Sequence, residues 1–117
     1  MTILRSDTVY VRCLKLKGSS VVICGECENG AQAVEDAKQL NPDLIVLNLS
    51  MPVMNGMQAA PLLRKMLPQT LIIMFTIFAN ATLLELALGV GVAAVISKDR
   101  AASQLLPNAQ SLLSLNS

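Results

Sequence analysis

Four polar side chains stand where apolar stretches of the sequence end, and together they suit one kind of chemistry. They are Asp7, Asn48, Thr76 and Lys98. A carboxylate, a hydroxyl and an ammonium around one point fit a phosphoryl group: Lys neutralises one oxygen, Thr donates to another, and Asp holds a divalent cation that bridges to a third. The alternative is that strands commonly end in a polar residue. The pattern alone leaves both interpretations open.

The stretch that carries Asn48 has the pattern of a buried strand. Residues Leu44–Leu49 are apolar except for Asn48, as in a strand that is covered on both faces. Pro52 and the pair Asn55-Gly56 then turn the chain into a loop. Ligands bind outside the carboxyl ends of the strands in open α/β sheets, so we expect Asn48 to lie in or beside any site.

Strands and helices alternate along the rest of the chain. The predicted strands are Ile3-Leu4, Val21–Cys24, Leu44–Leu49, Leu71–Phe75 and Ala93–Ile96, and the predicted helices are Asn29–Leu40, Asn55–Leu67, Asn80–Leu88 and a last helix from Asp99. Alternation at this spacing predicts an α/β fold, a three-layer sandwich with a five-stranded parallel sheet. The commonest topology of this kind is the flavodoxin-like (βα)5 fold with strand order 2-1-3-4-5.

Residues 8–17 fit this alternation least well. Val9, Val11 and Cys13 occupy every second position, and Lys15 and Lys17 continue the same spacing, which favours a strand. Their position between two predicted strands favours a short helix, and we predict a helix. No linker rich in Pro, Gly or Ser divides the chain, so we expect a single domain over residues 1–117 without an output domain.

Composition excludes several classes of function. The chain has no His, which rules out His-based metal sites and catalytic triads, and its net charge is only +1. No run of basic residues is longer than Arg64-Lys65, so we expect no direct nucleic-acid binding. No apolar run approaches a membrane span, and the first residues lack a signal-peptide layout, so we expect a cytoplasmic protein. The spacing of Cys24 and Cys27 is that of a redox or half-zinc motif, but a second pair is missing and we expect buried thiols.

The stretch Asp43–Gly56 resembles the third strand and following loop of the receiver domain of bacterial two-component response regulators. In that family an aspartate on this strand is followed by Pro four residues later and Gly eight residues later, and Pro52 and Gly56 have both spacings from position 48. Residues Ile73–Thr76 resemble the fourth-strand motif and Gly91–Lys98 the fifth. The segment from residue 24 to residue 30 resembles the second strand and following loop in one subgroup of the family, whose receivers often precede a helix-turn-helix output domain. The resemblance covers about residues 21–113.

The resemblance implies a role in phosphorelay signal transduction, with a sensor histidine kinase as phosphodonor and position 48 as phosphoacceptor. It implies that Mg²⁺ is held by position 48, by Asp7 and by the backbone carbonyl of Ser50. It implies that Thr76 and Lys98 contact the phosphoryl group. An aromatic switch residue is expected where this chain has Val95. The surface formed by the fourth helix, fifth strand and fifth helix then changes partners.

The chain departs from that pattern at the nucleophile and at the metal site. Asn48 is a neutral carboxamide, far less nucleophilic than a carboxylate and a poorer Mg²⁺ ligand, so we expect no acyl phosphate. The region around Asp7 offers one carboxylate where the family has two, so we expect weak Mg²⁺ binding. The stretch up to Gly25 is about one helical turn short, and we expect the first strand or first helix to be short or rebuilt. Lys98 is expected either to pair with Asp7 or to be solvated.

The chain also departs from the pattern on the surface that would contact partners. Val95 lacks the ring that couples the site to that surface. The helix over residues 80–88 is apolar on nearly every side, which makes Leu83, Leu86 and Val95 candidates for an interface. The alternative is that a neighbouring element of the same domain covers this helix.

Three hypotheses follow for the function. The first is a degenerate single-domain receiver, or pseudo-receiver, that is not an enzyme and acts by protein–protein contact with a histidine kinase, another signalling protein or a second copy. The second is an ordinary phosphoaccepting receiver seen as an Asp-to-Asn variant or as a fragment of a DNA-binding regulator. The third, an enzyme or nucleotide-binding protein, requires a Gly-rich phosphate loop after a strand, and the sequence has none.

Overall fold

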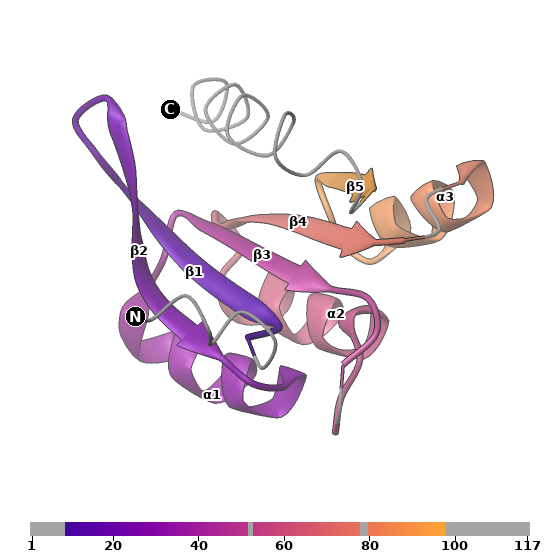
Figure 1. The fold of residues 1–117 in the computed structure, drawn as a ribbon, viewed down its shortest axis with the longest axis horizontal. Helices are drawn as coiled ribbons and strands as arrows, with labels where there is room; N and C mark the ends of the chain where they lie inside the picture. Colours follow the sequence, from indigo (N-terminus) through magenta and orange to yellow (C-terminus); the bar gives the residue numbers. More distant parts are fainter. Residues whose placement is uncertain (1–8, 52, 78–79, 98–117) are drawn as a thin grey trace.

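Five strands form one sheet in the computed structural model, which describes residues 9–51, 53–77 and 80–97 (Figure 1). The strands are β1 (Val11–Lys17), β2 (Ser20–Cys27), β3 (Leu44–Asn48), β4 (Leu71–Thr76) and β5 (Ala94–Ser97), and the helices are α1 (Gly30–Leu40), α2 (Gly56–Met66) and α3 (Ala81–Gly89). Their order in the sheet is β2-β1-β3-β4-β5. This confirms the predicted order 2-1-3-4-5 and the flavodoxin-like α/β fold.

The helix predicted over residues 8–17 is wrong, because Val11–Lys17 is the strand β1. The two-residue turn Gly18-Ser19, with Gly18 at φ +61°, joins it to β2 as a hairpin. A hairpin connects only antiparallel strands, and β1 is antiparallel to both β2 and β3. The expectation of an all-parallel sheet therefore fails at β1, while β3, β4 and β5 are parallel.

The alternation of side chains in β1 explains why the strand wins over the helix. Val11 and Cys13 are at most 1% exposed and belong to the main core, whereas Arg12 and Leu14 face the other side of the sheet and line a pocket. A helix would have spread these residues around its axis. The predicted strand Ile3-Leu4 lies outside the described residues, and β1 occupies the position between β2 and β3.

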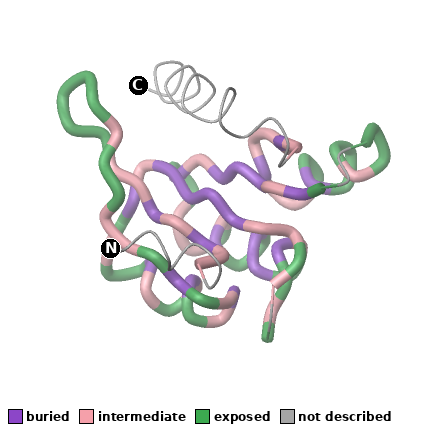
Figure 2. The backbone as a smooth tube through the Cα atoms, viewed as in Figure 1, coloured by how far each residue is buried: buried purple, intermediate pink, exposed green. Residues whose placement is uncertain are grey.

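The main core lies between the sheet and the helices α1 and α2 (Figure 2). The sheet contributes large apolar side chains, and the helices contribute mainly small ones, which let them approach closely. The fully buried core residues of the three central strands and two helices are Val11, Cys13, Ile45, Leu47, Ile72, Met74, Ala33, Ala37, Ala59, Ala60 and Leu63. This packing fixes the strand β3, and with it the position of Asn48.

A second, smaller core cluster lies on the opposite face of the sheet. Its buried members are Leu44, Val46, Ile73 and Ile96. None of the residues in this cluster comes from α1, α2 or α3. The predicted last helix from Asp99 lies outside the described residues. Among those residues, helices therefore contribute to the core on one face of the sheet only.

Asparagine caps set the start of each described helix. Asn29 accepts from the N–H of Gln32 over 2.8 Å, and Asn80 accepts from the N–H of Leu83 over 2.8 Å. Asn55 forms a complete capping box with Gln58. Because Asn55 also ends the loop after β3, this cap fixes the length of the loop that follows Asn48.

Candidate functional site

Asn48 is the last residue of β3 and lies at the edge of the sheet where the parallel strands end. Its backbone N–H donates to the carbonyl of Tyr10 over 2.9 Å, and the N–H of Leu49 donates to the carbonyl of Phe75 over 2.8 Å. Asn48 is half-buried and opposite Phe75 in the parallel register. Bonds from both neighbouring strands therefore hold the backbone that carries this side chain.

Gly56 closes the loop beneath Asn48. Its N–H donates to the carbonyl of Leu49 over 2.8 Å. A Cβ added at Gly56 would lie 2.7 Å from the Asn48 carbonyl oxygen and 2.7 Å from Cδ1 of Leu47. Only glycine allows α2 to begin this close to the end of β3. The spacing from position 48 to Gly56 thus has a steric cause in this chain.

Thr76 ends β4 at the same edge. It is 5% exposed and pairs with Ser97, the last residue of β5, in the parallel register. The structure therefore brings Asn48 and Thr76 to one edge from neighbouring strands, as the sequence predicted. Lys98 follows Ser97 directly but lies outside the described residues.

Asp7 also lies outside the described residues, and among the described ones Tyr10 is the neighbour of Asn48 at this edge. Because β1 runs antiparallel, its amino end, and not its carboxyl end, lies beside Asn48. Sequence reasoning missed Tyr10 because the segment was assigned to a helix. The alternation from Val9 to Cys13 was the signal that could have placed it.

Oxygen ligands for a divalent cation are few at this edge. The described residues contain no group of three or more Cys, Asp, Glu or His side chains that could hold a metal ion. Asn48 offers a neutral amide oxygen and the exposed Ser50 a backbone carbonyl. Mg²⁺ is normally bound through one or two carboxylates, and neither of these residues supplies one. The described part of the edge by itself does not fit Mg²⁺.

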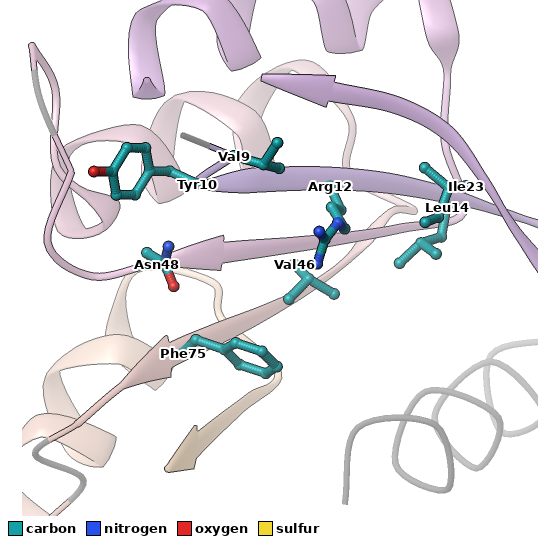
Figure 3. A pocket seen from close by; sticks show the side chains of 8 residues that line it. All are labelled: Val9, Tyr10, Arg12, Leu14, Ile23, Val46, Asn48 and Phe75. Carbon is teal, nitrogen blue, oxygen red and sulfur yellow. The ribbon is translucent and has the colours of Figure 1, made fainter. Parts of the chain in front are cut away.

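A pocket of about 170 Å³ opens on the sheet face opposite α1 and α2, and Asn48 lies at one end of it (Figure 3). The lining residues are Val9, Tyr10, Arg12, Leu14, Ile23, Val46, Asn48 and Phe75. Arg12 forms an ion pair with Glu26 over 2.9 Å, and both side chains are 41% exposed. Such an exposed pair contributes only about 0–1 kcal/mol, so Arg12 is held weakly beside the apolar wall.

The three cysteines are free thiols in this structure. Cys13 and Cys27 are at most 1% exposed, which confirms the predicted burial for Cys27, while Cys24 is half-buried. Desolvation by burial, together with the nearby thiols and Asp36, raises the pKa of Cys13 to about 12. Desolvation and then Asp36 raise the pKa of Cys27 to about 11. These two thiols stay protonated at neutral pH and are unreactive there.

The candidate interface residues lie on α3 and β5. Leu86 is 57% exposed, and its helix neighbours Leu84 and Leu88 are 41% and 50% exposed. Leu83 and Val95 are only half-buried. Val95 pairs with Met74 and packs against the main core. The described residues thus leave three leucines of α3, Leu84, Leu86 and Leu88, in contact with solvent.

Comparison with known proteins agrees with this arrangement. The family profile of the response regulator receiver domain matches residues 8–110. The transcriptional regulatory protein LnrK of Bacillus subtilis is 32% identical over 84 residues, which cover 72% of this chain and 38% of that protein. The response regulator protein VraR of Staphylococcus aureus is 34% identical over 87 residues, which cover 74% of this chain and 42% of VraR. The chain therefore spans less than half the length of these relatives.

Solved structures give the same result. The receiver domain of the putative response regulator NarL from Mycobacterium tuberculosis superposes with a TM-score of 0.71 at 28% identity, over 78% of this chain and 73% of that one. The response regulator domain of Thermotoga maritima CheB superposes with a TM-score of 0.67 at 28% identity, over 75% and 73% of the two chains. Within the described ranges, none of the helices is both long and apolar enough to cross a membrane.

Proposed function

This chain belongs to the response-regulator receiver family of two-component systems, and we propose that it is a degenerate receiver that does not accept a phosphoryl group. One observation carries the proposal: the residue at the carboxyl end of β3, where the family has its phosphoacceptor, is Asn48. A carboxamide is neutral, and its oxygen is a much weaker nucleophile toward phosphorus than a carboxylate oxygen. We propose that the protein is not an enzyme.

The surroundings of Asn48 support the same proposal. Phosphoryl transfer relies on a divalent cation to neutralise the developing charge, and the described oxygen donors at this edge do not include a carboxylate. Asp7, Ser50 and Asn48 together would provide one carboxylate and two neutral oxygens. We propose that Mg²⁺ binds this set weakly, if the side chain of Asp7 reaches it, and that Thr76 and Lys98 are remnants of phosphoryl-contact positions.

We propose that the protein acts by contact with other signalling proteins in the cytoplasm, with no direct binding to nucleic acid or membrane. Receiver domains interact with histidine kinases and other signalling proteins, and a kinase is the partner that the family suggests. The exposed leucines of α3, with Leu86 at 57% exposure, support a contact surface there. Leu83 lies one turn from Leu86 on the same helix, Val95 lies on β5, and a second copy could occupy the same surface. Because Val95 has no ring to move, this contact would not be switched in the way usual for the family.

The test is incubation with acetyl phosphate and Mg²⁺, followed by intact mass measurement. We expect no added phosphoryl mass on this protein, and none on Asn48→Ala. A phosphoaccepting receiver treated in parallel shows that the reagent works. A phosphoryl mass that is present on this protein and lost in Asn48→Ala would refute the proposal. A coding sequence with Asp at position 48 would instead support an ordinary phosphoaccepting receiver.

A further inference from the structure

The strand β2 forms the outer edge of the sheet, and we propose that this edge binds a second copy of the chain. In the proposed dimer the two β2 strands pair antiparallel across a two-fold axis near Val22. Identical strands related by a two-fold axis perpendicular to the sheet are necessarily antiparallel. The pairing extends the sheet from one copy into the other, by the same backbone hydrogen bonds that join β1 to β2.

The first argument is that the first part of β2, before the bulge at Cys24, carries neither the charges nor the prolines that normally protect an edge. Among the described residues β2 pairs with β1 alone. Its residues 20–25 are Ser-Val-Val-Ile-Cys-Gly, with no charge and no proline. Sheet edges that stay unpaired usually carry Lys or Pro or are covered by another segment. Three consecutive β-branched residues are instead well suited to strand pairing.

The second argument is the shape of the hairpin. Pairing of β1 with β3 ends at Leu14, whereas pairing of β1 with β2 continues to Lys17 and Ser20. The tip of the hairpin therefore projects beyond the rest of the sheet (Figure 1). On the β3 side of the tip, the carboxylate of Asp43 accepts from the N–H of Leu16 over 2.7 Å. No described residue covers the outer side of β2 in this way.

The third argument is the set of side chains that the pairing would bring together. Val22 and Ile23 are 37% and 54% exposed, and Leu16 on β1 is 39% exposed. With the axis at Val22, Val21 of each copy lies opposite Ile23 of the other, next to the cross-strand pairs Leu16–Val21 and Leu14–Ile23. An apolar row would then run across both sheets. The bulge at Cys24, where the β1–β2 register shifts, ends this row.

The fourth argument is charge. Lys15 and Lys17 lie near the hairpin tip, and Glu26 and Glu28 lie at the far end of β2. In an antiparallel pair centred on Val22, the end of β2 that carries Glu26 lies beside the hairpin tip of the other copy, which carries Lys17. Opposite charges therefore meet at both ends of the pair. A parallel arrangement would set like charges side by side, so the charges favour the direction that two-fold symmetry requires.

The first test is a cysteine cross-link at the axis. Val22→Cys, made together with Cys24→Ser so that Cys24 cannot compete, should form a covalent dimer through residue 22 under mild oxidation. Cys13 and Cys27 remain and are at most 1% exposed. The matched control is Glu35→Cys on the exposed side of α1, in the same Cys24→Ser background. A dimer yield at residue 22 no higher than at residue 35 would overturn the proposal.

The second test is sedimentation velocity over a range of concentrations. We expect the unaltered protein to show a dimer, and Val22→Lys to weaken it by at least about tenfold, because two Lys side chains would meet at the axis. Leu86→Lys, on the separate α3 surface, should leave this dimer unchanged. Circular dichroism and the urea midpoint report whether Val22→Lys still folds. A protein that is monomeric throughout, or a folded Val22→Lys variant that dimerises normally, would contradict the proposal.

Discussion

The backbone N–H of Asn48 donates to the carbonyl of Tyr10 over 2.9 Å. This bond follows from the reversed direction of β1, whose amino end lies at the edge where the parallel strands β3, β4 and β5 end. The reversed direction of β1 and the neutral side chain of Asn48 affect the same place. The neighbour of Asn48 is the aromatic residue Tyr10, which directly precedes β1. The strand β1, which lies between β2 and β3, brings no carboxylate to this edge.

Restoring a carboxylate at position 48 should restore part of the metal affinity. We predict that Mg²⁺ raises the melting temperature of Asn48→Asp and leaves that of the unaltered protein nearly unchanged. At ten times the dissociation constant, a bound ion stabilises a protein by about 1.4 kcal/mol. For a small domain, each kcal/mol of added stability raises the melting temperature by about 4–8 °C. Differential scanning fluorimetry in Mg²⁺, with K⁺ at matched ionic strength as control, measures the shift, and an equal rise in both proteins would contradict the prediction.

Gly56 should tolerate no side chain. In Gly56→Ala the new Cβ would lie 2.7 Å from the Asn48 carbonyl oxygen, and relief of that contact must move α2 or β3. We predict a loss of about 1–3 kcal/mol in the free energy of unfolding, the usual cost of overpacking. Gly89→Ala is the matched control, because a Cβ there meets nothing within 4 Å. Urea unfolding of both variants decides, and equal midpoints would show that the loop accommodates the methyl group.

The strongest sequence patterns predicted the fold well. The two apolar strands β3 and β4 and the helices α1 and α2 depend on local patterns that the structure keeps. The direction of β1 could not be read in the same way. The direction depends on how the turn at Gly18-Ser19 is interpreted. If the turn is a hairpin turn, residues 11–17 form an antiparallel strand; if it is the end of a helix, they form the helix of a βαβ unit. The position between two predicted strands then favoured the helix over the alternation.

Only part of the candidate site could be predicted, again because the structure of residues 8–17 was uncertain. Asn48 and Thr76 lie at the ends of strands whose pattern is unambiguous, so their convergence followed from parallel pairing. Tyr10 and the pocket beside Arg12 depend on which face of β1 each residue occupies. A strand and a helix with the same sequence point their side chains in different directions. Because residues 8–17 were predicted to be a helix, the faces of Tyr10 and Arg12 could not be predicted from the sequence. Asp7 and Lys98 remain predictions.

Arg64 should matter far more to stability than its neighbour Lys65. Its guanidinium donates to the carbonyl of Thr70 over 2.6 Å, to that of Gly91 over 3.2 Å and to that of Pro68. These bonds join the end of α2 to the segments that lead into β4 and β5. We predict that Arg64→Ala lowers the free energy of unfolding by about 2–3 kcal/mol, the cost of losing hydrogen bonds to a charged group. Lys65→Ala, on the exposed side of the same turn, should change it by less than about 0.5 kcal/mol, and similar losses in the two variants would refute this role.

The buried thiols should make the protein less stable at alkaline pH. Burial raises the pKa of Cys13 to about 12 and that of Cys27 to about 11, above the ordinary value of 9.0. Above pH 9 the unfolded chain loses these protons before the folded protein does, so the free energy of unfolding falls as pH rises from about 9 to 12. The slope is at most about 1.4 kcal/mol per pH unit for each thiol. Urea unfolding at several pH values should show a shallower decline in Cys13→Ala/Cys27→Ala, whereas an unchanged slope would assign the decline to other groups.

The exposed surface of α3 around Leu86 should contact a partner and contribute little to the stability of the fold. Leu86 is 57% exposed, so Leu86→Lys removes little buried apolar area and should change the free energy of unfolding by less than about 0.5 kcal/mol. It should nevertheless abolish association through α3, because a charge placed at the centre of an apolar contact must be desolvated. Leu62→Lys, at a 43% exposed position on α2, is the control. Two measurements distinguish the α3 surface from the β2 edge. One is binding of each variant to an immobilised histidine kinase, and the other is sedimentation of the double variant Leu86→Lys/Val22→Lys. If Leu86→Lys binds and sediments as Leu62→Lys does, the surface around Leu86 has no partner.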